Sequence, residues 1–108
     1  MEEMSAHTVY VPHYSVDFNY SKAERFGELE YGFTFDFSGN GTFDHSVKER
    51  IRGFMSSFDA EVDFLLVSGS PSMCMYALAC AIERNEEPIS ILRFDRETRG
   101  YKEVLFDV

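Results

Sequence analysis

Residues 63–82 read DFLLVSGSPSMCMYALACAI, a strand, a turn and a helix in direct succession. The apolar run from Phe64 to Val67 is typical of a strand that is covered on both faces. Ser70 is placed to cap a helix that begins with Pro71, because proline is favoured at the first helical position. Such a unit points the N–H groups of a helix start at the carboxyl edge of a sheet. Open α/β folds usually bind ligands at that edge, so we expect any site to lie there.

Strands and helices alternate along the rest of the chain. By hydrophobic periodicity we predict strands at residues 8–14, 33–37, 62–67, 89–94 and 101–106. The same reasoning predicts a short helix that starts near residue 21 and longer helices at residues 46–58 and 71–85.

The order of these elements predicts the fold. Strands 8–14, 62–67 and 89–94 are separated by helical crossovers, so they should be parallel. The last two strands flank a charged turn and should pair antiparallel. We therefore expect residues 1–108 to form one α/β domain. Its small, mixed and mostly parallel sheet would be flanked by helices on both faces, in a Rossmann-like or flavodoxin-like arrangement with a C-terminal antiparallel hairpin. A two-layer α+β sandwich is the alternative.

Two capping boxes mark helix starts, each with a serine three residues before a glutamate: Ser21 with Glu24, and Ser46 with Glu49. The second box opens an amphipathic helix with one apolar stripe, formed by Val47, Ile51, Phe54, Met55 and Phe58. Gly53 within this helix costs about 1 kcal/mol relative to alanine. We therefore expect it to allow the close approach of a neighbour.

Composition limits the class of protein. With 108 residues, 44% of them hydrophobic, the chain is long enough for one domain with its own core. Its 19 acidic and 10 basic residues give a net charge of −9. That charge argues against direct binding to nucleic acid, where Lys and Arg supply most of the affinity by neutralising phosphates.

No targeting or membrane segment is visible. The first residues are acidic, whereas a secretory signal begins with a basic region. The longest apolar run, Met73–Ile82, is about half a membrane span. We expect a cytoplasmic protein without membrane contact, located in the host cytoplasm if it is viral.

The helix at 71–85 is apolar on nearly every side, so it must be buried on nearly every side. A small sheet covers only one side, and the other needs helix packing or a second subunit. We infer a homodimer through this helix. Its two cysteines, Cys74 and Cys80, are separated by about 9 Å of helical rise, too far for a disulfide, and we interpret them as small buried hydrophobes in a reducing compartment.

The turn after the central strand is the candidate ligand site. Backbone N–H groups and hydroxyls of Ser68, Gly69, Ser70 and Ser72 could hold a phosphate or carboxylate. The turn lacks the further glycines of a dinucleotide loop and the lysine of a P-loop. A tight turn in which Gly69 supplies special dihedral angles is the structural alternative.

If the first strand is parallel to the central one, its end brings further polar groups to the same edge. His13, Asp17 and Arg25 would then line the opposite wall. A Ser–His–Asp arrangement of Ser68 or Ser70 with His13 is conceivable, but the G-x-S-x-G pattern of a nucleophile elbow is absent. We therefore name no catalytic residue.

Other constellations are weaker. The three histidines, His7, His13 and His45, are scattered and show no zinc spacing, so we predict neither a metal nor a cofactor. Four bases of the C-terminal hairpin could clamp an anionic ligand or an acidic partner: Arg93, Arg96, Arg99 and Lys102. Interleaved acids favour a solvated charged hairpin instead.

Short blocks along the chain carry a resemblance to a known group. They are Asp17-Phe18, Ala23-Glu24-Arg25-Phe26-Gly27-Glu28, residues 63–71, Leu92-Arg93-Phe94-Asp95-Arg96 and Gly100-Tyr101. In this order the chain resembles short bacteriophage-encoded proteins of unknown function, which show A-E-x-F-G-E, D-Y-L-L-L-S-G-S-P and L-x-W-D-R…Y blocks. It departs from them at Phe94, where they often carry tryptophan, and in the glycine turn at residues 38–41. The resemblance implies viral or prophage origin and assigns no residue roles.

Three functions remain open. The first is a non-enzymatic phage accessory protein that binds a small anionic ligand or a protein partner. The second is an inhibitor of a nucleic-acid-binding host defence enzyme, with the acidic surface as a decoy. The third is a small serine-dependent hydrolase.

Overall fold

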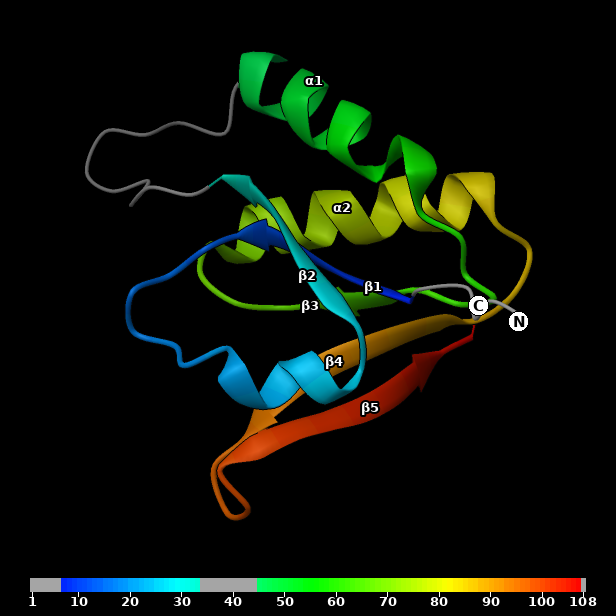
Figure 1. Ribbon diagram of the computed structural model, residues 1–108. Coiled ribbons are helices and arrows are strands. Elements are labelled where there is room, and N and C mark those ends of the chain that lie inside the picture. The colour runs from blue at the N-terminus through cyan, green and yellow to red at the C-terminus, as the bar shows by residue number, and fades with distance from the viewer. Residues whose placement is uncertain (1–6, 34–44, 108) are drawn as a thin grey trace.

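The computed structural model describes residues 7–33 and 45–107. Along the chain these form β1 (Thr8–His13), the 3₁₀ helix η1 (Ser21–Arg25), β2 (Glu28–Phe33), α1 (His45–Phe54), the 3₁₀ turn η2 (Met55–Ser57), β3 (Phe64–Leu66), α2 (Pro71–Arg84), β4 (Ile89–Asp95) and β5 (Gly100–Phe106) (Figure 1).

The five strands form one sheet in the order β2-β1-β3-β4-β5. β1 is parallel to both of its neighbours, and Val9 is in register with Leu29 of β2 and with Phe64 of β3. β3 and β4 are also parallel, whereas β4 and β5 form an antiparallel hairpin. This strand order is that of flavodoxin-like sheets, in which the strand sequence reverses its order between β1 and β3. The predicted small α/β fold, with its mixed sheet and C-terminal hairpin, is confirmed.

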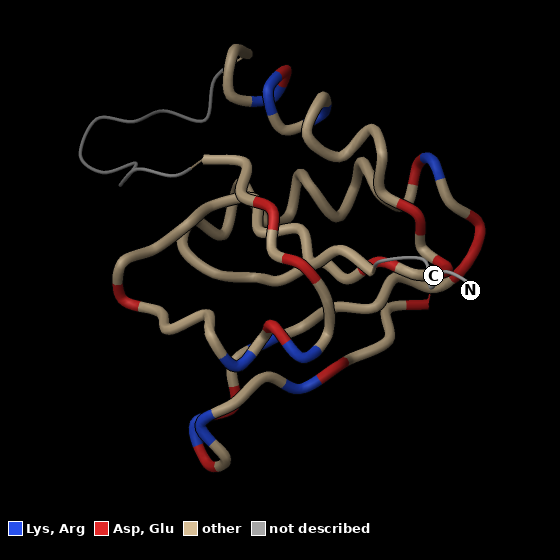
Figure 2. The backbone as a smooth tube through the Cα atoms, viewed as in Figure 1, with Lys and Arg blue, Asp and Glu red and all other residues tan. Residues whose placement is uncertain are grey.

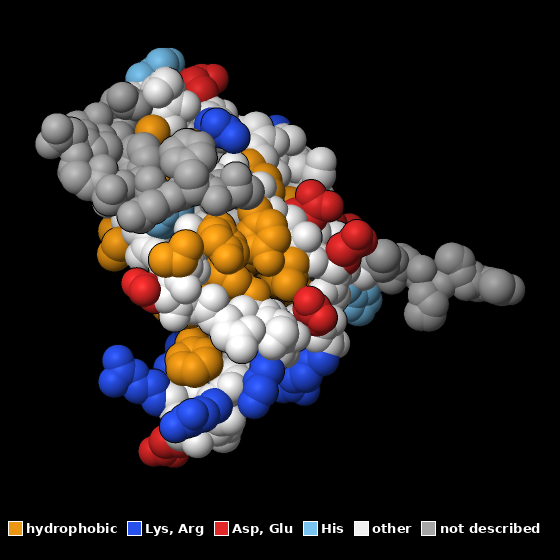
Figure 3. Space-filling view, turned by 60° about the vertical axis from the view of Figure 1, so that its left-hand side comes forward, with side chains coloured by type: hydrophobic (Ala, Val, Ile, Leu, Met, Phe, Trp, Pro, Cys, Tyr) orange, Lys and Arg blue, Asp and Glu red, His pale blue; other side chains and the backbone are white. Residues whose placement is uncertain are grey.

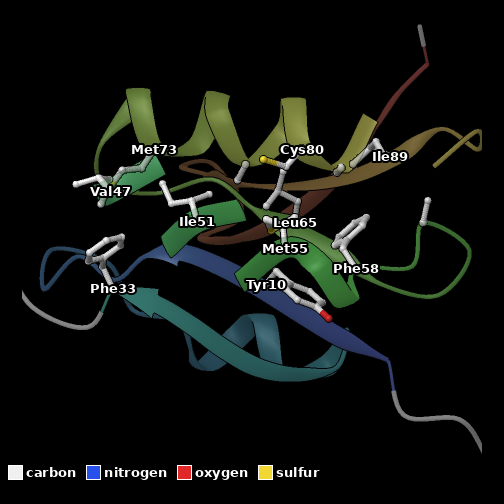
Figure 4. Close-up of a cluster of buried hydrophobic side chains, with 13 residues drawn as sticks. Tyr10, Phe33, Val47, Ile51, Met55, Phe58, Leu65, Met73, Cys80 and Ile89 are labelled. Carbon is white, nitrogen blue, oxygen red and sulfur yellow. The ribbon is translucent and has the colours of Figure 1, made fainter. Parts of the chain in front are cut away.

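The two faces of the sheet are covered unequally. Successive strand residues point to opposite faces, so Tyr10 and Leu65 pack under α1 and α2, while Val9 and Leu66 pack against η1. Figure 4 shows the first of these clusters, in which Tyr10, Leu65 and Ile51 come from three different elements. Of the described elements, both long helices thus cover one face, and the 3₁₀ helix η1 with its flanking loops covers the other (Figure 1). The expectation of helices on both faces is therefore met on the second face by this short 3₁₀ helix.

The predicted starts of the helices are only partly correct. η1 begins at Ser21, but its N-cap is Tyr20 and makes no side-chain capping bond. The Ser21 N–H instead donates to Asn19 Oδ1 at 3.0 Å, so the capping box predicted for Ser21 and Glu24 is wrong. α1 begins at His45, one residue before the predicted Ser46 cap. The predicted strand at 33–37 falls outside the described residues after Phe33.

The apolar stripe of the second helix is confirmed, because Val47, Ile51, Met55 and Phe58 are all buried. Gly53 does not have the predicted role. A Cβ added there would have no atom within 4 Å, so this glycine faces open space rather than a close neighbour.

Helix α1 packs along one side of α2. The Arg52 guanidinium donates to Glu83 Oε1 at 3.0 Å and to the Tyr76 hydroxyl at 2.9 Å. Another part of the α2 surface remains exposed, and Met75 is 66% accessible there. Cys74 and Cys80 are free and buried, and burial raises the pKa of both thiols. Among the described residues, no helix combines the length and apolarity needed to cross a membrane.

Candidate functional site

Three chain segments meet at the carboxyl edge of the parallel strands. β1 runs into residues 14–19, β3 into the turn at residues 67–70, and β4 into the hairpin turn at residues 96–99. Because β1, β3 and β4 are parallel, these segments share one edge, as predicted. The edge includes the point between β1 and β3 where the strand order reverses, which is where α/β sheets place ligands.

The end of β1 and the start of α2 are joined through His13. The Ser70 N–H donates to His13 Nδ1 at 2.8 Å, so the neutral ring carries its proton on Nε2. Ser70 also caps the helix, with its Oγ accepting from the Met73 N–H at 3.4 Å. Gly69 has a φ of +71°, and a Cβ there would overlap the His13 ring. The turn and the imidazole are therefore fitted closely together.

Ser68 lies beneath this turn and is 6% exposed. Its hydroxyl donates to the His13 carbonyl oxygen at 2.9 Å and is 2.7 Å from the Tyr20 hydroxyl. The Tyr20 oxygen in turn accepts the Ser15 N–H at 2.9 Å. Burial raises the pKa of Tyr20, so its hydroxyl keeps its proton at neutral pH. The Cys74 thiol donates to the Ser68 carbonyl at 3.2 Å.

These bonds tie Ser68 and His13 to backbone groups. The imidazole nitrogen that faces the turn accepts a backbone N–H, and the Ser68 hydroxyl donates to a backbone carbonyl. A serine nucleophile needs its hydroxyl directed at such a nitrogen. The geometry suits a structural junction better than a nucleophile with its base.

A groove runs beside this junction. A hollow of about 560 Å³ is lined by Asp17, Phe18, Asn19, Val67, Phe94 and Arg96. A second hollow, of about 460 Å³, is lined by Ser15, Asp17, Phe18, Val67, Ser68, Gly69, Pro71 and Cys74. The two share Asp17, Phe18 and Val67 and therefore adjoin each other. We call them together the carboxyl-edge groove.

The first hollow combines aromatic rings with charge. Phe18 and Phe94 pack edge to face, with ring centroids 6.3 Å apart. Arg96 and Asp17 are exposed and carry opposite charges. Such a groove can accept a flat ring against its aromatic side chains and an anion at the guanidinium.

The residues predicted for the site are only partly brought together. Ser68 and Gly69 line the groove, Asp17 lines both hollows, and His13 lies buried beneath the turn. Ser72 is exposed on the first turn of α2. Arg25 lies elsewhere, 4.3 Å from the Phe26 ring centroid, in a separate hollow of about 340 Å³.

Several groove residues were missed as site residues, among them Phe18, Asn19, Phe94 and Arg96. The signal for Phe94 and Arg96 was present in the strand order, because a β4 parallel to β3 must end at the same edge. Arg96 was instead grouped with the hairpin bases.

Charge is distributed unevenly over the molecule. Six of the 10 bases lie on η1 and the β4–β5 hairpin, at one end of the protein (Figure 2): Lys22, Arg25, Arg93, Arg96, Arg99 and Lys102. Figure 3 shows several Lys and Arg side chains together at one end of the molecule, next to apolar side chains. Within the described part of the chain, no three His, Cys, Asp or Glu residues are placed to hold a metal ion.

Comparison with known proteins identifies the family. A family model described as Phage Pam3 gp32-like protein matches residues 6–108, nearly the whole chain. The chain matches no curated protein and no solved structure. The match agrees with the phage origin implied by the short sequence blocks. The chain therefore belongs to the family of phage Pam3 gp32-like proteins.

Proposed function

We propose that this protein is a non-enzymatic phage accessory protein that binds a small anionic ligand with an aromatic ring in the carboxyl-edge groove. One observation carries the proposal: a guanidinium and two phenyl rings line one hollow at the edge where α/β sheets place ligands. The volume of about 560 Å³ falls in the usual range for small-molecule sites.

The side chains that line the groove suit different parts of such a ligand. The rings of Phe18 and Phe94 offer apolar surface to a flat ring. The Arg96 guanidinium can form two parallel hydrogen bonds with a phosphate or carboxylate. The Asp17 carboxylate and the Asn19 amide suit hydroxyl or amino groups, because a carboxylate accepts and an amide both donates and accepts.

The turn at Ser68–Ser70 forms a wall of this site rather than its anion hole. The Ser70 N–H is engaged by His13, and the Ser68 hydroxyl is engaged by the backbone of β1. An anion that replaced these bonds would loosen the junction between β1 and α2. We therefore assign the anion to Arg96.

Arg96→Ala should weaken binding of AMP at least about tenfold, because a hydrogen bond to a charged group contributes about 1.5–3 kcal/mol. Isothermal titration calorimetry with AMP, adenosine and inorganic phosphate measures the effect. AMP should bind more tightly than either fragment. Arg99→Ala is the matched control, since Arg99 lies in the same hairpin turn but does not line the groove.

Two results would contradict the proposal. One is the absence of heat from any of the three compounds at millimolar concentration. The other is an equal loss of affinity in the Arg96 and Arg99 variants, which would indicate general attraction to the basic end of the molecule.

A second function, the acidic decoy, is favoured by the opposite end of the molecule. Residues 58–63, 85–88 and 107 contain no Lys or Arg. Five acids in these segments are exposed: Asp59, Glu61, Glu86, Glu87 and Asp107. Acidic segments lie near the two chain ends in Figure 2. A partner with a basic nucleic-acid groove would meet this surface.

If the decoy function holds, capture by an immobilised basic nuclease should fall steeply from low to moderate salt, because exposed charges are screened. The double variant Glu86→Gln, Glu87→Gln should weaken capture more than the control pair Glu28→Gln, Glu30→Gln on β2. Capture that is insensitive to salt would exclude the decoy.

A further inference from the structure

The two edge strands of the sheet differ in what they expose. β2 and β5 stand at the ends of the strand order. On β2 the exposed side chains are Glu28 and Glu30, which discourage pairing with another strand. β5 instead carries three consecutive exposed apolar residues: Val104 at 40%, Leu105 at 62% and Phe106 at 41%. Its outer edge pairs with no other strand of the described chain.

The apolar surface continues across the hairpin. Val104 is in register with Ile91 and Phe106 with Ile89 on the neighbouring strand β4. These four residues point to one face of the sheet, and Leu105 points to the other. Natural edge strands of this kind are usually short, charged or covered. The exposed C-terminal half of β5, from Val104 to Phe106, carries no charge.

We propose that β5 pairs antiparallel with β5 of a second copy of this chain. The twofold axis lies between Val104 and its copy. The pairing of the two β5 strands joins the two five-stranded sheets into one. The inference does not depend on the proposed ligand, because the groove lies at the other end of β4.

The charges of β5 argue against three other registers. In an antiparallel pair, facing residues lie on the same face of the sheet, and side chains alternate between the faces along each strand. Two copies of one strand related by a twofold axis must therefore set one residue opposite its own copy, and we name each register by that residue. An axis at Lys102 or at Glu103 would set that residue opposite its own copy, and like charges in such positions are destabilising. An axis at Leu105 would set Glu103 opposite Asp107, again two like charges.

An axis at Val104 avoids every such conflict. Val104 then faces its own copy, Glu103 faces Leu105, and Lys102 faces Phe106. The lysine can lay its stem and ammonium group on the phenyl ring. Each strand thus complements a second copy of itself, and this is why the occupant is another copy rather than an unrelated strand.

Sedimentation equilibrium of the full chain and two variants tests the proposal. The wild type should sediment with the mass of two chains. Val104→Lys should reduce this to one chain, because two lysines would face each other at the axis. Met75→Lys is the matched control, since Met75 is equally apolar and exposed on α2. It should remain dimeric.

Cross-linking tests the register itself. Val104→Cys should form an intermolecular disulfide on oxidation, because directly facing residues have Cα atoms about 4.5–5.5 Å apart, within disulfide range. Leu105→Cys should not, since its facing residue is Glu103. The native Cys74 and Cys80 are buried and should not compete. Circular dichroism confirms that each variant is folded.

Three outcomes would overturn the proposal. If the wild type sediments as a monomer, the proposed dimer does not form. If Met75→Lys dissociates the dimer and Val104→Lys does not, the interface lies on α2, the helix first expected to form it. Equal cross-linking at positions 104 and 105 excludes the register.

Discussion

Gly69→Ala should lower the free energy of unfolding by about 3 kcal/mol. The left-handed backbone at Gly69, with a φ of +71°, costs an L-residue about 1–2 kcal/mol. The new Cβ would also overlap the His13 ring, and forcing atoms into a packed site costs about 1–3 kcal/mol. Relief of this overlap would move the ring away from the Ser70 N–H.

Urea unfolding followed by circular dichroism measures the change. Gly53→Ala is the matched control, because the same methyl group would meet open space on a helix surface. That variant should be up to about 1 kcal/mol more stable than the wild type. Similar behaviour of the two variants would show that the contact between Gly69 and His13 does not exist in solution.

Asp63→Ala should also lower the free energy of unfolding by about 3 kcal/mol. The carboxylate is 6% exposed and accepts two backbone N–H groups, from Thr8 at 3.1 Å and from Asp59 at 2.9 Å. Each hydrogen bond to a charged group contributes about 1.5–3 kcal/mol, part of which local rearrangement recovers. Asp63 therefore anchors the start of β1 to the start of β3.

The same unfolding experiment separates this role from simple charge removal. Glu61→Ala removes an exposed acid two residues away and should change stability by less than about 0.5 kcal/mol. Asp63→Asn keeps one acceptor oxygen. Its loss of stability should therefore lie between those of Asp63→Ala and Glu61→Ala. A negligible effect of Asp63→Ala would mean that water replaces both bonds at no cost.

Elements with strong local signals were predictable from the sequence. The unit β3–α2 combines an apolar run, a serine cap and a proline at the first helical position, and each signal is local. β2 was missed because Glu28 and Glu30 give this edge strand a polar pattern. The cap at Ser21 failed because the nearby Asn19 side chain takes the Ser21 N–H instead.

The edge of the sheet where the candidate groove lies was predictable, but the residues that line the groove were not. Parallel strand order alone places the ends of β1, β3 and β4 on one edge. The bond between His13 and Ser70 joins residues 57 positions apart and has no signal in either segment. Phe18 and Arg96 lie in loops, where no periodicity indicates which way a side chain points.

The central position of β1 has a consequence for the route by which the chain folds. The bond from Thr8 to Asp63 spans 55 residues, whereas β4 and β5 are joined by a tight turn. The entropy lost on closing a loop rises with its length, so the hairpin forms at small cost and the β1–β3 pairing at a larger one. Sheet assembly should therefore start at the C-terminal edge and finish in the middle, and the carboxyl-edge groove should be among the last parts of the molecule to take shape.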